Sequence, residues 1–401
     1  MMALRPHRLS TMRLLRDLSL SAVIAGFVAV LVGFTSSAAI VFSAAQASGA
    51  SDAEIASWMW ALGLGMGATC IGLSLRYRVP VVTAWSTPGA AMLITGAAGL
   101  PLAEIVGAFV VSAVLTTALG FSGWLERALS RLPTSLASGM LAGVLLRFGL
   151  NVFTSMQAQF ALVFAMFLGW LLARRWSPRY AVVITLAIGV AIAAVQGQLH
   201  LGDVRVTLAQ PIWITPKFSL AAVIGVAIPL FVVTMASQNI PGIAILRAHG
   251  YQETPVSPLI GWTGLVTLVL APFGAFALNL AAITAAICMG SDAHEDSRRR
   301  YVAAVAAGVF YLLTGLFGAT VAALFAAFPK ELVLAIAGIA LLTTIGNGLA
   351  AAVHDPQERE PALITFLVTA SGVSAFQIGS VFWGMVAGLL ALAITRRRHP
   401  A

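Results

Sequence analysis

Long apolar segments separated by short polar breaks run through almost the whole of this sequence. Of its 401 residues, 60% are hydrophobic and only 9% are charged, whereas soluble domains carry about a quarter charged residues. A helical bilayer crossing takes roughly 20 apolar residues, so fourteen crossings would occupy about 280 residues. We therefore predict an all-α polytopic membrane protein with about 14 transmembrane segments and no room for a separate soluble domain.

Glycine, proline and charged residues mark the breaks between the apolar segments. The run that begins at Leu18 is too long for the apolar region of a signal peptide, so we expect the first span to be retained. The predicted spans are residues 18–43, 57–75, 79–97, 101–121, 132–150, 157–173, 179–196, 218–246, 258–274, 275–290, 301–327, 332–351, 361–374 and 376–395.

Basic residues sort to one side of this predicted membrane. With the N-terminus inside, only Arg147, Arg205, Lys217 and Lys330 of the 23 Lys and Arg residues fall outside. This is the positive-inside bias of a cytoplasmic membrane protein, and it predicts cytoplasmic termini at residues 1–17 and 396–401. The net charge of +9 therefore reflects membrane topology, and we expect no nucleic acid partner.

The longest polar interruption follows the seventh span and divides the spans into two sets of seven. We predict a first repeat at residues 18–196, an extracytoplasmic linker at 197–217 and a second repeat at 218–395. An odd number of spans per half inverts one half relative to the other. Secondary transporters often have this organisation, with the substrate site near the midplane where helices are broken.

The third span contains the first such break. It opens with VPVVTAWSTPGAAMLI, residues 79–94, and its β-branched first half predicts a short extended strand because Pro80 cannot lie inside a helix. Pro88 suits the first turn of a new helix, with Ser86 or Thr87 as the N-cap and Gly89 beside it.

The tenth span, seven spans later, contains the second break. GAFALNLAAITAAIC, residues 274–288, aligned with the third span predicts another short strand and a half-helix capped by Asn279. Two half-helix N-termini that meet in mid-membrane would attract an anion, most simply a carboxylate. Alternatively, Ser86 and Asn279 only satisfy backbone groups at the helix breaks.

Catalytic and metal-binding patterns are missing from the sequence. The six histidines fall in loops or tails, none clusters with acids or cysteines at metal-ligand spacing, and no nucleophile has a nearby base. Acidic residues also avoid the two breaks, and Glu104 is the one acid well inside a span. We therefore expect no enzyme activity, cofactor or metal, and an anionic rather than cationic substrate.

The eighth span interrupts its apolar run with two amides, Gln238 and Asn239. Its segment SQNIPGIAILRAHGY, residues 237–251, together with residues 79–89 and 276–284, resembles the benzoate/proton symporter (BenE) family over essentially the whole chain. That family is similar in fold to the nucleobase permeases. The resemblance implies a core domain of spans 1–4 and 8–11, a gate domain of spans 5–7 and 12–14, and a homodimer.

The resemblance also implies where substrate binds. In the nucleobase permeases, acids from spans 8 and 10 hold the base, whereas this chain carries amides there, which can donate to a carboxylate. Because those acids are missing, the proton-coupling group stays unidentified. Thr35 and Ser36 in span 1 either approach the ligand or bond to their own helix, and Phe34 and Trp85 either stack on an aromatic ring or pack. The predicted substrate-binding residues are Ser86, Thr87, Gly89, Gln238, Asn239, Asn279, Thr35 and Ser36.

The leading hypothesis is a secondary transporter in the inner membrane that imports benzoate or a close relative with a proton, by movement of the core against the gate. Its partners are then a small aromatic carboxylate, a proton and the lipid bilayer. Two alternatives stay open, namely transport of another anion or a nucleobase on the same fold, and a membrane scaffold that transports nothing. Competition by a ligand panel separates benzoate transport from transport of another substrate. The absence of saturable uptake indicates the scaffold.

Overall fold

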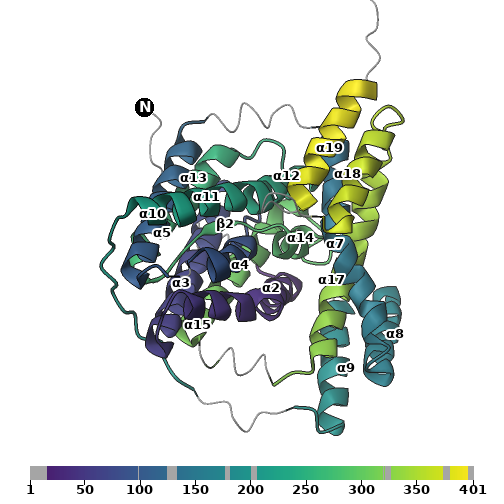
Figure 1. Cartoon of the computed structure of the whole chain (residues 1–401). Coiled ribbons are helices and arrows are strands. Elements are labelled where there is room, and N and C mark those ends of the chain that lie inside the picture. Colours follow the sequence, from purple (N-terminus) through teal and green to yellow (C-terminus); the bar gives the residue numbers. More distant parts are fainter. Residues whose placement is uncertain are drawn as a thin grey trace, which may run out of the picture.

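The computed structural model describes residues 16–97, 99–123, 133–176, 181–199, 206–318, 320, 327–373 and 380–395. Over this part of the chain the structure is mostly helical, with a two-stranded sheet near its centre (Figure 1). The helices of the first half are α2 (Leu20–Ala47), α3 (Asp52–Tyr77), α4 (Thr87–Gly96), α5 (Leu102–Phe121), α7 (Thr134–Ser155), α8 (Phe160–Trp176) and α9 (Ala181–Val195).

The second half opens with a long, irregular helical segment. The segment is built from α10 (Leu220–Ala222), a π-helix η3 (Val223–Ala227), α11 (Ile228–Thr234), a second π-helix η4 (Met235–Asn239) and α12 (Ile240–Ala248). The remaining helices are α13 (Val256–Leu270), the 3-10 turns η5 (Ala271–Phe273) and η6 (Ser297–Arg299), α14 (Ile283–Met289), α15 (Tyr301–Leu316), α17 (Lys330–Ala352), α18 (Arg359–Ser371) and α19 (Ser380–Thr395).

Several helices are long and apolar enough to cross a membrane. Within the described residues there are four, namely α3, α5, α7 and the segment Val256–Phe273, or five if the two parts of α17, bent by 42°, form one span. A polytopic helical membrane protein is therefore supported by length and composition. The count of fourteen crossings remains a prediction.

The helices form two bundles, which Figure 1 shows side by side. The first bundle contains the sheet, α2 to α5 and α10 to α15, and its buried residues form one large apolar cluster. The second bundle contains α7, α8, α9, α17, α18 and α19, and a separate apolar cluster lies among α7, α8, α9 and α17. The bundles meet where α7 and α17 contact α2, α12 and α14.

The two strands pair at the centre of the first bundle. β1 (Thr83–Trp85) pairs antiparallel with β2 (Leu278–Leu280), and Ala84 lies opposite Asn279. The ladder is extended on both sides, because Ser86 N donates to Ala277 O at 3.1 Å and Ala281 N donates to Val82 O at 2.9 Å. Backbone groups that a helix would satisfy internally are thus satisfied between two distant segments.

The two half-helices start differently. Ser86 is the N-cap of α4, with its hydroxyl accepting from Gly89 N at 3.1 Å and Pro88 in the first turn, as predicted. The prediction that Asn279 caps the second half-helix is wrong, since α14 begins at Ile283 and its N-cap Ala282 makes no side-chain bond. Strand pairing through Leu280 delays the start of the helix, and this leaves Asn279 within β2.

Both π-helices precede a proline. η3 ends two residues before Pro229, and η4 ends two residues before Pro241. Proline lacks the N–H of a regular helical turn and crowds the carbonyl four residues earlier, so a widened turn absorbs the mismatch without breaking the helix. Gly242 then allows close contact with β2, because a Cβ there would lie 2.6 Å from Leu280 Cβ.

Candidate functional site

A cavity of about 190 Å³ lies beside the central sheet in the first bundle. Its walls come from α2, α3, the β1–α4 segment, the irregular eighth span, the start of α14 and α15, so residues from both halves of the chain enclose it. None of the described residues that line it is charged. They are Val32, Gly33, Ser37, Met66, Ala84, Trp85, Thr87, Gln238, Pro241, Ala281, Ala282, Ile283, Thr284 and Tyr311.

Two of the predicted site residues face this cavity. Thr87 is the first residue of α4, and Gln238 lies in the second π-helix. Both side chains are partly exposed, and neither makes a hydrogen bond to another residue that the structure describes. Their hydroxyl and amide groups are therefore available to a ligand.

An aromatic wall closes one side of the cavity. The Trp85 ring packs edge to face on Phe34, with centroids 4.8 Å apart, and Tyr311 lies next to Phe34 at 6.4 Å. Trp85 Nε1 donates to Ser37 Oγ at 2.8 Å, which holds the indole in place. The sequence-based prediction missed Ser37 and Tyr311 as lining residues. The sequence signal for Tyr311 is a phenol inside an otherwise apolar span.

Ser86 and Gly89 serve the packing of α4 instead of lining the cavity. The fully buried Ser86 hydroxyl accepts from Gly89 N and from Thr234 Oγ1, the latter at 2.9 Å. A Cβ on Gly89 would lie 2.7 Å from Leu230 Cδ1. Both residues therefore fix the start of the half-helix against the eighth span.

Asn239 connects the second π-helix to the sheet. Its side chain is fully buried, and its carbonyl oxygen accepts the backbone N–H of Leu280 at 2.9 Å. Its amide nitrogen lies 3.5 Å from Met235 Sδ. In this structure the Asn239 amide therefore satisfies the strand backbone and does not face the cavity.

Asn279 is buried without a partner. It lies opposite Ala84, a cavity residue, and its side chain is fully buried. Neither its amide oxygen nor its amide nitrogen makes a hydrogen bond within the described residues. Such a group costs about 1–3 kcal/mol of desolvation, so its retention at this place needs a reason that the protein fold alone does not provide.

The remaining predicted residues, Thr35 and Ser36, lie within α2, two and three residues after the cavity residue Gly33. Their side chains fall outside the described part of the structure. Their predicted roles therefore stay untested.

A second, larger cavity of about 380 Å³ lies between the two bundles, at the end of the molecule that carries Arg298, Arg299 and Arg300. We call this the arginine-rich end. Residues from both bundles line the cavity, which we call the inter-bundle cavity. They are Ser21, Ile24, Ala25, Val28, Ser138, Val182, Val183, Ala248, His249, Gly250, Ile287, Met289, Gly290, Ser291, Asp292, Arg300, Thr343, Asn347, Gly348 and Ala351.

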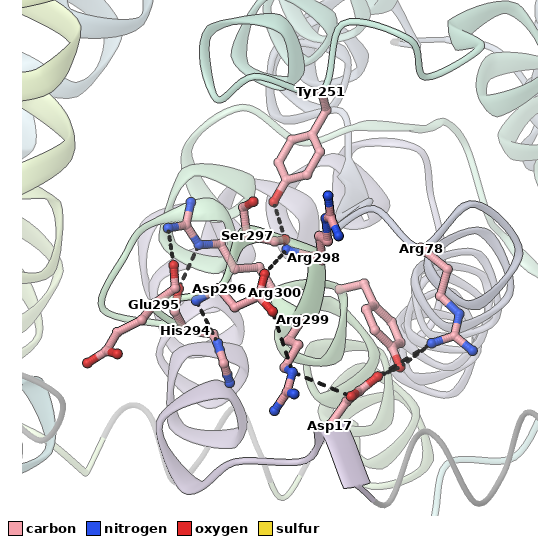
Figure 2. A network of polar contacts seen from close by, with 11 residues as sticks. Asp17, Arg78, Tyr251, His294, Glu295, Asp296, Ser297, Arg298, Arg299 and Arg300 are labelled. Carbon is pink, nitrogen blue, oxygen red and sulfur yellow. Dashed lines mark hydrogen bonds and ion pairs between the residues drawn. The ribbon is translucent and has the colours of Figure 1, made fainter.

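A polar network crosses the same end of the first bundle (Figure 2). Asp17 accepts a hydrogen bond from Tyr301 Oη at 2.8 Å and lies 3.5 Å from Arg78 Nη1 and 3.7 Å from Arg299 Nε. Arg78 also donates to Tyr301 Oη at 2.8 Å. The network ties the segment before α2 to the end of α3 and to the turn before α15, which stabilises this end of the bundle.

A cavity without a charged residue among its described lining, beside interrupted helices inside an apolar helical body, is typical of α-helical membrane transporters. The chain belongs to the BenE family, described as benzoate membrane transport protein, whose family model matches residues 16–394. Members of this family are membrane transporters and not enzymes.

Two relatives match almost the full length of the chain. It is 51% identical over 382 residues to the inner membrane protein YdcO of Escherichia coli, covering 94% of this chain and 97% of that protein. It is 42% identical over 379 residues to a benzoate membrane transport protein of Acinetobacter baylyi, covering 94% of this chain and 96% of the relative.

The similarity of this chain to solved structures is weaker than its similarity to these two relatives. A structure of SLC26A9 matches 95% of this chain at 10% identity and a TM-score of 0.48, and the alignment spans 66% of that protein's chain. The expected fold relation to the nucleobase permeases is not supported by this comparison.

Proposed function

We propose that this protein is a secondary active transporter that imports an aromatic carboxylate, benzoate or a close relative, together with a proton. It resides in the inner membrane with both termini in the cytoplasm, and the arginine-rich end faces the cytoplasm. The first bundle is the core that holds the substrate, and the second bundle is the gate against which it moves. Assembly as a homodimer is part of the same proposal.

The observation that carries this proposal is the chemistry of the 190 Å³ cavity. The hydroxyl of Thr87, the amide of Gln238 and the ring of Trp85 belong to residues that line it. Neutral donors bind a carboxylate without the electrostatic conflict that an acidic side chain would cause, and an aromatic wall suits a planar ring. The family's description points to the same substrate class.

The eight predicted residues take different parts in this proposal. Thr87 and Gln238 contact the substrate, and Asn279 contributes its unbonded amide when the site closes around the ligand. Ser86, Gly89 and Asn239 act indirectly, because their contacts hold α4 and β2 in position. Thr35 and Ser36 in α2 remain predicted substrate contacts. Since α14 has only seven residues, its dipole is a minor contribution compared with these side chains.

Reciprocal helix packing supports the inverted repeat. α3 packs along α15, and α5 packs along α13. A shift of seven spans converts the first pair into the second, because α3 and α13 occupy equivalent places in the two halves, as do α5 and α15. Both crossings are also tight at paired glycines, Gly63 with Gly315 and Gly120 with Gly261. We infer that residues 18–196 and 218–395 are the two repeats.

Uptake into proteoliposomes tests the transport function. With an inward proton gradient, labelled benzoate should accumulate and saturate, and unlabelled benzoate should compete better than uracil or bicarbonate. Dissipating the gradient with a protonophore should abolish accumulation but leave benzoate exchange. Folded protein without saturable uptake of any panel member would leave only the scaffold hypothesis, whereas preference for another ligand would redefine the substrate.

The two buried asparagines provide a matched pair of variants. Asn239→Leu should lower the melting temperature, because the Leu280 N–H loses its acceptor at a cost of about 1–3 kcal/mol. Asn279→Leu should leave the melting temperature equal or higher, because it removes two unbonded polar atoms, yet it should reduce benzoate uptake. Thermal denaturation and uptake kinetics measure both effects. An Asn279→Leu protein with unchanged uptake kinetics would remove Asn279 from the substrate site.

A further inference from the structure

The inter-bundle cavity is lined in part by charged side chains, whereas the 190 Å³ cavity has none among its described lining residues. Among the described residues, its titratable lining groups are His249, Asp292 and Arg300, all from the first bundle. Uncharged polar groups of Thr343 and Asn347 face it from α17 of the second bundle. Asp292 is the one acidic residue among the described residues that line either cavity.

The Arg300 side chain is held in place by hydrogen bonds to backbone carbonyls. Its guanidinium donates to His294 O at 2.7 Å, to Met289 O at 2.8 Å and to Glu295 O at 3.3 Å. Met289 is the last residue of α14, so the cation also lies at the negative end of that helix. These bonds hold Arg300 as a fixed positive charge.

His249 is poorly suited to carry an extra proton. Its Nδ1 lies 2.9 Å from Ile245 O, and since a carbonyl only accepts, the ring nitrogen there carries the hydrogen. Burial lowers the pKa of His249, and the charge of Arg300 lowers it further, against the bond to Ile245. Burial and the charge of Arg300 therefore both favour the neutral imidazole.

Asp292 differs from both neighbours. Its carboxylate makes no hydrogen bond or ion pair with another described residue. Burial raises the pKa of Asp292, and the guanidinium groups of Arg174 and Arg300 offset part of that rise. The carboxyl therefore takes up and loses a proton at a higher pH than an ordinary aspartate does.

Arg174 belongs to the opposite bundle. It lies near the end of α8, where its Nη1 donates to Thr343 Oγ1 at 2.7 Å, and its guanidinium lies over the Trp170 ring. The charge that acts on Asp292 from Arg300 moves with the first bundle, whereas the charge from Arg174 moves with the second. Relative movement of the bundles therefore changes how strongly the carboxylate form is stabilised.

We propose that Asp292 is the proton-carrying group of this transporter and that Arg174, from the facing bundle, promotes proton release into the inter-bundle cavity. With the cavity open and Arg174 close by, the carboxylate form is favoured and the proton leaves. When the first bundle slides along the second so that Asp292 leaves Arg174 but stays buried at the interface, burial dominates and the proton is retained. This inference rests on the proposed proton coupling and names the group that performs it.

Asp292→Asn tests the proposal in proteoliposomes, with Glu295→Gln as the matched control, since Glu295 is an exposed acid in the same loop. Asp292→Asn should reduce benzoate accumulation driven by a proton gradient about tenfold or more, while exchange of labelled for unlabelled benzoate stays within about twofold, because exchange needs no proton release. Asp292→Glu should restore part of the accumulation. Glu295→Gln should behave as the unmodified protein.

The outcomes separate this inference from the function on which it rests. If the unmodified protein shows saturable uptake that ignores the proton gradient, proton coupling itself fails and the role of Asp292 fails with it. If the unmodified protein is coupled and Asp292→Asn still accumulates benzoate normally, Asp292 is not the carrier and the transport function stands.

A second variant decides the matter if Asp292→Asn loses exchange as well or does not fold. Arg174→Gln keeps Asp292 but removes the opposing charge, which raises the pKa of the carboxyl. The pH dependence of gradient-driven uptake should therefore shift to higher pH. Arg175→Gln, an exposed neighbour on α8, should leave the profile unchanged. An identical pH profile for Arg174→Gln and the unmodified protein would overturn the proposal.

Discussion

Replacing Gln238 with glutamate is expected to abolish most benzoate uptake at neutral pH. The cavity has no charged residue among its described lining, so a carboxylate there would meet the substrate carboxylate without a compensating cation. Two like charges about 4 Å apart at an effective dielectric constant of about 20 repel by about 4 kcal/mol. We therefore expect kcat/KM for uptake to fall about 100-fold or more, since solvent relaxation reduces the full repulsion.

Gln238→Ala separates charge from hydrogen bonding. It removes a donor without adding a charge, and a hydrogen bond to a charged group is worth about 1.5–3 kcal/mol, so uptake should fall about 10- to 150-fold and less than in Gln238→Glu, which loses the same donor and adds the repulsion. Gln157→Glu makes the same chemical change on an exposed turn between α7 and α8 and should have no effect. Initial rates in proteoliposomes, normalised to folded protein, provide the comparison. Equal losses for Gln238→Ala and Gln238→Glu would show that charge repulsion at this position is unimportant.

Gly63→Ala is expected to destabilise the protein strongly for a purely geometric reason. α3 and α15 cross so closely that a Cβ on Gly63 would lie 2.4 Å from Gly315 Cα and 2.8 Å from Tyr311 O. Both contacts are with backbone atoms, so no side chain can rotate away. The helices must separate, at a cost of about 1–3 kcal/mol or more, and the melting temperature should fall by several degrees.

Gly72 provides a control on the same helix. No atom lies within 4 Å of a Cβ built there, so Gly72→Ala gains only the higher helix propensity of alanine, worth about 1 kcal/mol. The two alanine variants should therefore shift the melting temperature in opposite directions. Thermal denaturation of purified protein, monitored by size-exclusion chromatography, measures the melting temperatures of both variants. Similar melting temperatures for the two variants would contradict the tight crossing of α3 and α15.

Local pattern predicted the parts of the fold that depend on short stretches of chain. The Ser86 cap follows from a serine three residues before Gly89 and a proline in the first helical turn, because capping is decided within a few residues. Within the described residues, helices also lie in the predicted apolar segments except where β1 and β2 interrupt them, since a backbone in lipid must satisfy its own polar groups.

Side-chain roles around the breaks were harder to predict. Asn239 and Asn279 are both buried amides near broken spans, yet one bonds to the Leu280 N–H and the other makes no bond among the described residues. The difference depends on which residue of β2 lies beside the second π-helix. Tyr311 joins the cavity only because α15 packs against α2 and α3. Such partners are distant in sequence, so no local pattern identifies them.

The sequence by itself determined that this is a helical membrane protein with two interrupted spans. Scarcity of charge and the placement of proline act locally, so their effects do not depend on how the helices pack. Only the tertiary structure decided that β1 pairs with β2, that Gln238 and Thr87 face one cavity and that Arg174 bonds to Thr343, which lines the same cavity as Asp292. Those relations depend on register and on packing between remote segments. A shift of one residue in a strand would send each side chain to the opposite face.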